Sequence, residues 1–124
     1  MENNITKKSI TYKINIELLN AIDFKIAKEV IEGKEKRARG EIIEDAIRNF
    51  LSDNFEDEKN SVNLKKDSER KSSTYNIDIM LLKAIDMRIA EDIIKGIGKK
   101  TKREFIESAL KSFLYMELIE IERK

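Results

Sequence analysis

The stretch RARGEIIEDAIRNFL at residues 37–51 is repeated as KTKREFIESALKSFL at residues 100–114. In both copies apolar side chains recur at helical spacing, with charged side chains on the opposite side. Each stretch is therefore predicted to be an amphipathic helix. In the second copy Thr101-Lys-Arg-Glu104 forms a capping box, which marks where a helix begins. Ala38 takes the place of Thr101 in the first copy, so we expect a less sharply defined start there.

The repeat extends well beyond these helices. A shift of 63 residues aligns Lys8–Leu51 with Lys71–Leu114 without a gap, and 22 of the 44 aligned pairs are identical. The chain is therefore a duplicated unit. We expect one unit at residues 1–52, a polar linker at 53–69, and a second unit with a C-terminal helical extension at 70–124.

Each unit opens with alternating apolar and polar residues, which predicts a short strand. In unit one Ile10, Tyr12 and Ile14 alternate with Ser9, Thr11 and Lys13; in unit two Ser73, Tyr75 and Ile77 alternate with Ser72, Thr74 and Asn76. Asn15 or Asp78 then provides an N-cap for a helix. In unit one this helix is expected to run to about Glu32, with Val30 on its apolar arc and Gly33 at its C-terminal end.

The composition excludes most catalytic chemistry. The 124 residues include no Cys and no His, so there is no thiolate nucleophile, imidazole base or ordinary zinc site. The four glycines form no phosphate-binding loop. We therefore expect neither an enzyme nor a cofactor, metal or small-molecule ligand. No apolar run approaches the roughly 20 residues that span a bilayer, and the N-terminus lacks a signal sequence, so a cytoplasmic protein without a membrane partner is expected.

A strand with one apolar face needs a pairing partner, and units this small bury too little surface alone. Antiparallel pairing of the two strands within one chain meets both needs. The expected fold is therefore mainly α with a short two-stranded antiparallel β-ribbon. Its apolar side chains, including Tyr12 and Tyr75, should pack under the ribbon against four helices, and its polar ones should share the outer face.

The order strand, helix, helix resembles the ribbon-helix-helix (MetJ/Arc/CopG-like) DNA-binding superfamily. The strongest match is Arg37–Leu51, which is similar to the family's second-helix pattern, and Lys100–Leu114 repeats it. The likeness covers 88 of 124 residues, as two copies of 44. Most members are one-unit chains that dimerise, and here the region before the second helix is about two turns longer. Tandem forms of this kind resemble transcription regulators of archaeal filamentous viruses, of the AvtR type.

The resemblance implies an intramolecular pseudo-dimer that binds double-stranded DNA and regulates transcription, by repression as the default. It implies that the paired strands read bases in the major groove and that the second helix of each unit anchors phosphates at its N-terminus. The implied base contacts are Ser9, Thr11, Lys13, Ser72, Thr74 and Asn76. The implied phosphate contacts are Arg37, Arg39, Lys100, Thr101, Lys102 and Arg103.

Simpler interpretations stay open at the sequence level. The threonines and Lys13 can be ordinary exposed strand residues, and the basic connections can be solvated loops. The second-helix carboxylates Glu41, Glu44, Glu104 and Glu107 are expected to be caps or a solvated face. Alternative functions are a protein-interaction module such as an antitoxin, or a helical protein that only self-associates.

The C-terminal residues add an apolar surface beyond the repeat. Tyr115, Leu118, Ile119 and Ile121 point away from the stripe of the preceding helix, and such a patch needs cover. The candidates are the linker around Phe55 and Leu64, the first helix of a unit, or another chain. We expect another chain and hence a homo-oligomer, assembling on DNA.

Overall fold

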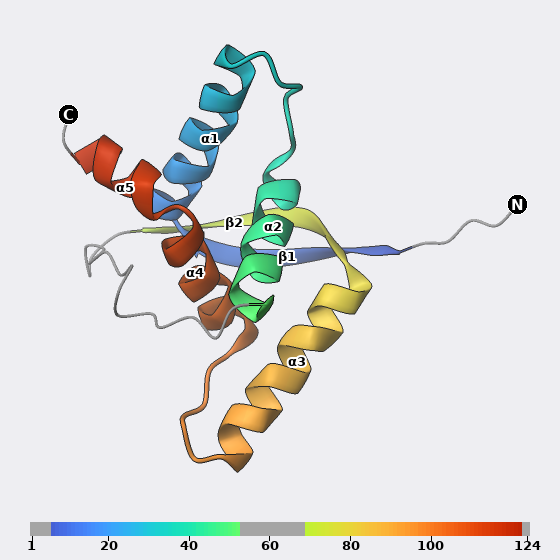
Figure 1. The fold of residues 1–124 in the computed structure, drawn as a ribbon. Helices are drawn as coiled ribbons and strands as arrows, with labels where there is room; N and C mark the ends of the chain where they lie inside the picture. Colours follow the sequence, from blue (N-terminus) through green and yellow to red (C-terminus); the bar gives the residue numbers. More distant parts are fainter. Residues whose placement is uncertain (1–5, 53–68, 123–124) are drawn as a thin grey trace, which may run out of the picture.

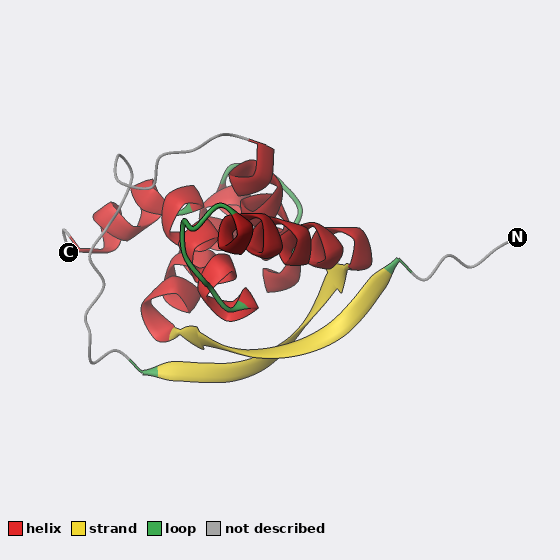
Figure 2. Ribbon diagram, turned by 90° about the horizontal axis from the view of Figure 1, so that it is seen from below, coloured by secondary structure: helices red, strands yellow, loops and turns green. Residues whose placement is uncertain are grey.

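The computed structural model describes residues 6–52 and 69–122 (Figure 1). The elements in order are β1 (Lys7–Asn15), α1 (Ile16–Ile31), α2 (Arg39–Ser52), β2 (Arg70–Asp78), α3 (Ile79–Ile94), α4 (Lys102–Phe113) and α5 (Tyr115–Glu122). The two strands form one antiparallel sheet, and the helices lie on one side of it (Figure 2). This confirms a mainly helical fold with a two-stranded antiparallel ribbon. Residues 53–68 of the predicted linker, Phe55 and Leu64 included, lie outside the described residues.

The helix ends follow the predicted signals. The Asn15 side-chain oxygen accepts a hydrogen bond from the Glu17 backbone N–H at 2.7 Å, and Asp78 caps α3 in the same way at 2.8 Å. The capping box of Thr101 and Glu104 is complete. Gly33 follows α1 with φ of 94°, a left-handed conformation that favours glycine.

The register of the ribbon is centred on Thr11 and Thr74, which face each other. Each strand has nine residues, longer than the predicted alternation. Hydrogen bonds tie the strand ends into the helices: the Ile16 N–H donates to the Glu69 carbonyl at 2.8 Å, and the Ile79 N–H to the Thr6 carbonyl at 2.7 Å. These two bonds occupy equivalent places in the two repeats, so the duplication extends to the backbone contacts.

The apolar core lies between the ribbon and the helices. Ile14 and Ile77 of the strands are fully buried, and Phe50 meets Phe105 edge to face at 5.2 Å where α2 packs on α4. Tyr75 is buried and Tyr12 is partly buried against the core, as predicted. Val30 departs from the prediction, since 44% of it is exposed. The reason is that α1 projects past the core at its C-terminal end (Figure 1).

The C-terminal segment is a separate helix that packs on α1 of the same chain. Helix α4 ends at Phe113, Leu114 is its C-cap, and α5 begins at the next residue. Leu118 is only 4% exposed, and Glu117 lies 3.5 Å from the Lys28 ammonium. Helix α1 therefore covers part of this segment, because the break at Leu114 turns Leu118 back onto the core, whereas Tyr115, Ile119 and Ile121 are only half-buried. Contact of this segment with another chain stays a prediction.

Candidate nucleic-acid interface

The six residues predicted to contact bases lie together on the outer face of the ribbon. The register opposes them in three direct pairs: Ser9 with Asn76, Thr11 with Thr74, and Lys13 with Ser72. All six are exposed, and none of the described helices covers this side (Figure 2). The two central hydroxyls share a hydrogen bond of 2.8 Å, and the Ser9 hydroxyl donates to the Asn76 side-chain oxygen at 2.8 Å.

The outer face differs between the repeats at one position. Lys13 and Asn76 are equivalent under the 63-residue shift, so one strand offers an ammonium where the other offers an amide. Lys13 has no hydrogen-bond or ion-pair partner among residues 6–52 and 69–122, so its three donors are free there. Because the Asn76 oxygen accepts from Ser9, its NH₂ group remains as the donor.

The ribbon is strongly basic although the whole chain carries a net charge of only +1. The two strands contain the five basic residues Lys7, Lys8, Lys13, Arg70 and Lys71, and one acidic residue, Asp78. Of these cations, Lys7 and Arg70 bind carboxylates of the helices. The other three are exposed and have no partner in the described part of the chain.

Two buried glutamates join the second helix of each unit to the strand ends of both units. Glu44 accepts hydrogen bonds from the Asp78 N–H at 2.8 Å and the Lys7 ammonium at 3.3 Å. Glu107 accepts from the Asn15 N–H at 2.9 Å and from the Arg70 guanidinium at 3.1 Å. Neither lies on a solvated face, which corrects that expectation, because the strand ends close over them. The other two second-helix carboxylates, Glu41 and Glu104, do act as caps, as predicted.

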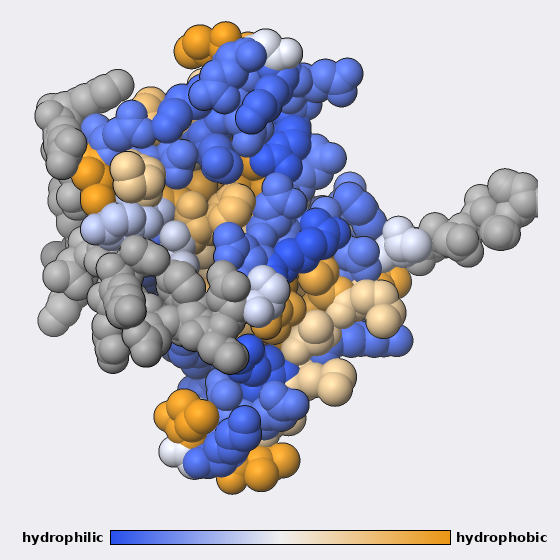
Figure 3. Space-filling view, viewed as in Figure 1, coloured by the Kyte–Doolittle hydropathy of each residue, from blue (hydrophilic) through white to orange (hydrophobic). Residues whose placement is uncertain are grey.

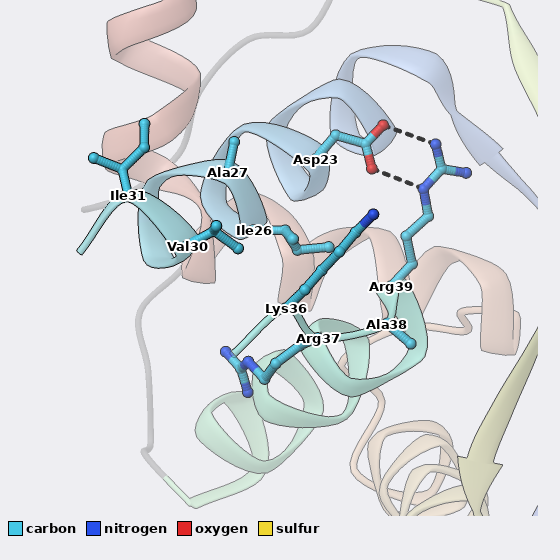
Figure 4. Close-up of a pocket in the computed structure, with 9 residues that line it drawn as sticks. All are labelled: Asp23, Ile26, Ala27, Val30, Ile31, Lys36, Arg37, Ala38 and Arg39. Carbon is cyan, nitrogen blue, oxygen red and sulfur yellow. Dashed lines mark hydrogen bonds and ion pairs between the residues drawn. The ribbon is translucent and has the colours of Figure 1, made fainter. Parts of the chain in front are cut away.

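The residues predicted to contact phosphates begin the helices α2 and α4, but they already have partners. Arg39 donates to both carboxylate oxygens of Asp23, at 2.9 and 2.8 Å (Figure 4). This hydrogen bonding raises the pKa of Arg39 above its usual value. In the second repeat Lys102 takes the same place, 3.3 Å from Asp86. Both pairs hold a cation at the start of a helix.

The other four predicted phosphate residues are also engaged within the chain. Arg37 donates to Glu29 at 2.9 Å and to Asp45 at 2.6 Å, and these carboxylates raise its pKa. The other three residues also form hydrogen bonds within the chain. Lys100 donates to the Ser108 hydroxyl and Arg103 donates to the Glu107 carboxylate, while the Thr101 hydroxyl accepts from the Glu104 N–H. Arg37 and Arg103 thus have structural roles in the free protein, and their phosphate contacts stay predictions.

Two hollows adjoin this basic region. One, of about 540 Å³, lies where the start of α2 meets β2 and is lined by Lys7, Arg39 and Asn76 among others. A Cβ atom on Gly40 would lie 3.0 Å from the Asn76 carbonyl oxygen, so a residue without a side chain lets α2 begin against the ribbon. Arg103 occupies the equivalent place in unit two, so the repeat itself gave no sign of this approach.

The other hollow, of about 740 Å³, lies between α1 and the connection to α2 (Figure 4). Ile26 and Val30 form its apolar wall, and Lys36 extends along it toward the Asp23–Arg39 pair. It shares two lining residues, Ala38 and Arg39, with the first hollow.

Within residues 6–52 and 69–122 no cluster of three or more acidic side chains is placed to hold a metal ion. None of the helices described there has the length and apolarity to cross a membrane. No protein-family model matches the chain, and neither the curated proteins nor the solved structures contain a match to it.

Proposed function

We propose that this chain is a tandem ribbon-helix-helix protein, an intramolecular pseudo-dimer that regulates transcription by placing its ribbon in the major groove of double-stranded DNA. The observation that carries the proposal is the outer face of the ribbon. Three opposed pairs of polar side chains lie exposed on the face of a basic sheet that the described helices leave uncovered.

The dimensions of the ribbon suit the groove. Two strands about 4.8 Å apart fit a major groove about 12 Å wide, and two-stranded ribbons are a known class of groove readers. The strands have nine residues each, so at roughly 3.3 Å per residue the ribbon is about 30 Å long. Its central pairs can therefore meet base edges while its ends stay near the backbone.

The exposed side chains supply matching donors and acceptors. Lys13 can donate to guanine O6 and N7, and the Asn76 amide can donate to adenine N7. The Thr11 and Thr74 side chains offer hydroxyls to base edges and methyl groups to thymine. A different residue at the equivalent positions 13 and 76 gives each half of the ribbon its own base preference.

The starts of α2 and α4 supply the phosphate anchors. Helix N-termini attract anions through their free N–H groups and the helix dipole. Arg39 uses Nε and one terminal nitrogen for Asp23, which leaves its other terminal nitrogen for a phosphate. Three lysines on the ribbon, which have no partner among the described residues, add a non-specific attraction to DNA phosphates.

The test is a binding-site selection from random duplexes, followed by titration of the selected duplex with variants. Lys13→Ala and Asn76→Ala should each weaken binding to the selected duplex by about 1–3 kcal/mol and relax the base preference at one position. Arg39→Ala should weaken all duplexes alike and reduce the salt dependence. Lys34→Ala is the matched control, since this exposed lysine pairs with Glu32 at the far end of α1. Unchanged binding by both strand variants would show that the ribbon does not read the bases.

A further inference from the structure

Helix α3 presents an apolar stripe to solvent. Met80, Met87 and Ile94 are spaced by seven residues and lie on one side of the helix, 68%, 64% and 84% exposed. Ile97 just beyond the helix is 69% exposed, and Figure 3 shows apolar side chains gathered over α3 and at its far end. Seven-residue spacing of apolar residues is the pattern of a helix that packs along another helix.

The equivalent face of α1 keeps this pattern only in part. Phe24 and Ile31 stand where α3 has Met87 and Ile94, but Glu17 stands where α3 has Met80. Lys28, the equivalent of Glu91, is bound to Glu117 and Glu120 of α5. Helix α1 has five buried residues, whereas α3 has two, Leu82 and Ile85. Within the described residues, α3 is therefore the less covered of two helices that arose from one sequence.

The charges beside the stripe are arranged as opposites around Met87. Lys83 stands four residues before it and Glu91 four residues after it, while Ala84 and Ala90 stand three residues before and after. Both charged residues are exposed, and neither has a hydrogen-bond or ion-pair partner among the described residues. In an antiparallel pair of identical helices, residues equally far before and after the centre lie at the same level.

We propose that α3 pairs antiparallel with α3 of a second copy of this chain, with a two-fold axis at Met87. Met80 then lies level with Ile94 of the second copy, and Lys83 lies level with Glu91 of the second copy. The small side chains of Ala84 and Ala90 leave room for those longer chains to cross the contact. A parallel pair would instead put like charges level, which is destabilising, so the charges select the antiparallel arrangement.

The contact is self-complementary, as a two-fold interface must be. Helix α3 has 16 residues, or about 24 Å at 1.5 Å per residue, so the pair buries less than the roughly 800 Å² per partner of a stable complex. The dimer should therefore form reversibly as concentration rises. The outer face of the ribbon points away from the helices and is left free (Figure 2).

Single-cysteine variants of the full chain test the axis directly, since the natural sequence has no cysteine. Under mild oxidation Met87→Cys should give a disulfide-linked dimer, because the two sulfurs meet on the axis. Met116→Cys is the matched control, since Met116 is a methionine of α5 that is 61% exposed, and it should stay monomeric. Equal cross-linking of the two variants would overturn the proposal.

The direction of pairing follows from two more variants. Met80→Cys mixed with Ile94→Cys should form a mixed disulfide dimer, while Met80→Cys alone should not cross-link. Efficient cross-linking of Met80→Cys alone would show a parallel pair and would also overturn the proposal.

Sedimentation of charge variants gives an independent readout. Lys83→Glu should raise the dimer dissociation constant at least about threefold, and the double variant Lys83→Glu with Glu91→Lys should restore it, because the opposite charges are level again. Met87→Glu should abolish the dimer without changing the circular dichroism, since the side chain is exposed in the monomer. A full-length protein that stays monomeric at all concentrations, or polymers that persist in Met87→Glu, would contradict the proposed interface.

Discussion

Arg37 joins three parts of the chain through one side chain. From the connection after α1 it donates to Glu29 of α1 and to Asp45 of α2. Its hydrogen bond lowers the pKa of Glu29 below the usual 4.5. Because folding lowers this pKa, the ion pair stabilises the protein fully above pH 4.5, and that contribution is lost as the pH falls through the pKa of the folded state.

We therefore expect Arg37→Ala to lower the free energy of unfolding by about 1–2 kcal/mol at pH 7. The difference from the unaltered protein should shrink at an acid pH below the lowered pKa of Glu29, where this carboxyl group is protonated in both proteins. Urea unfolding at the two pH values measures it. Lys34→Ala, which removes an exposed ion pair, should change the stability by less than about 0.5 kcal/mol. A difference for Arg37→Ala that does not depend on pH would contradict the assigned role.

At the scale of elements, α2 and α4 are the equivalent helices of the two repeats, but they begin differently. Thr101 caps α4 by accepting from the Glu104 N–H at 3.1 Å, and Glu104 accepts from the Thr101 N–H in return. In α2 only the second half of this motif exists, because Glu41 accepts from the Ala38 N–H at 2.9 Å but Ala38 has no hydroxyl.

Ala38→Thr should complete the capping box and raise the free energy of unfolding by about 1 kcal/mol, within a typical range of 0.5–2. Thr101→Ala should lower it by a similar amount, which makes the two variants reciprocal controls. Thermal unfolding followed by circular dichroism measures both. If Ala38→Thr is neutral while Thr101→Ala is destabilising, the start of α2 is held by its contact with the ribbon rather than by its cap.

The same elements show how far the sequence predicts the structure. Helices, caps and strands follow from local signals such as the periodicity around Ile14 and the Asn15 cap, and the pairing partner follows from the duplication. The roles of Glu44 and Glu107 do not, because they depend on strand ends that are distant in sequence. The shared outer face of the ribbon follows from the alternation in each strand together with the pairing of the two strands, whereas the ion pairs of the basic connections depend on long-range packing against α1 and α3.

At the scale of the whole molecule, the duplication makes a nearly symmetric structure from one chain. Glu44 with Lys7 matches Glu107 with Arg70, and Arg39 with Asp23 matches Lys102 with Asp86. The symmetry fails at α5, which only the second unit has among the described residues, and at the Lys13 and Asn76 positions on the ribbon.

This asymmetry predicts the form of the DNA site. One ribbon should select two unlike half-sites, because Lys13 favours guanine where Asn76 favours adenine. Asn76→Lys should make the halves alike and shift the selected site toward a palindrome. Sequencing of duplexes selected by both proteins measures this. A perfect palindrome within one ribbon's footprint for the unaltered chain would instead indicate that strands pair between chains.

The central claim is that the outer face of the ribbon binds duplex DNA, and one titration tests it most directly. Fluorescence anisotropy of a labelled duplex pool, at low salt, compares the unaltered chain with Thr11→Asp, which puts a carboxylate at the centre of that face. Ile31→Asp is the control, since it adds the same charge at an 85% exposed residue at the far end of α1. We predict binding by the unaltered chain and by Ile31→Asp, and at least about tenfold weaker binding by Thr11→Asp, a loss of about 1.4 kcal/mol. Equal binding by Thr11→Asp, or no binding by the unaltered chain, would contradict the account.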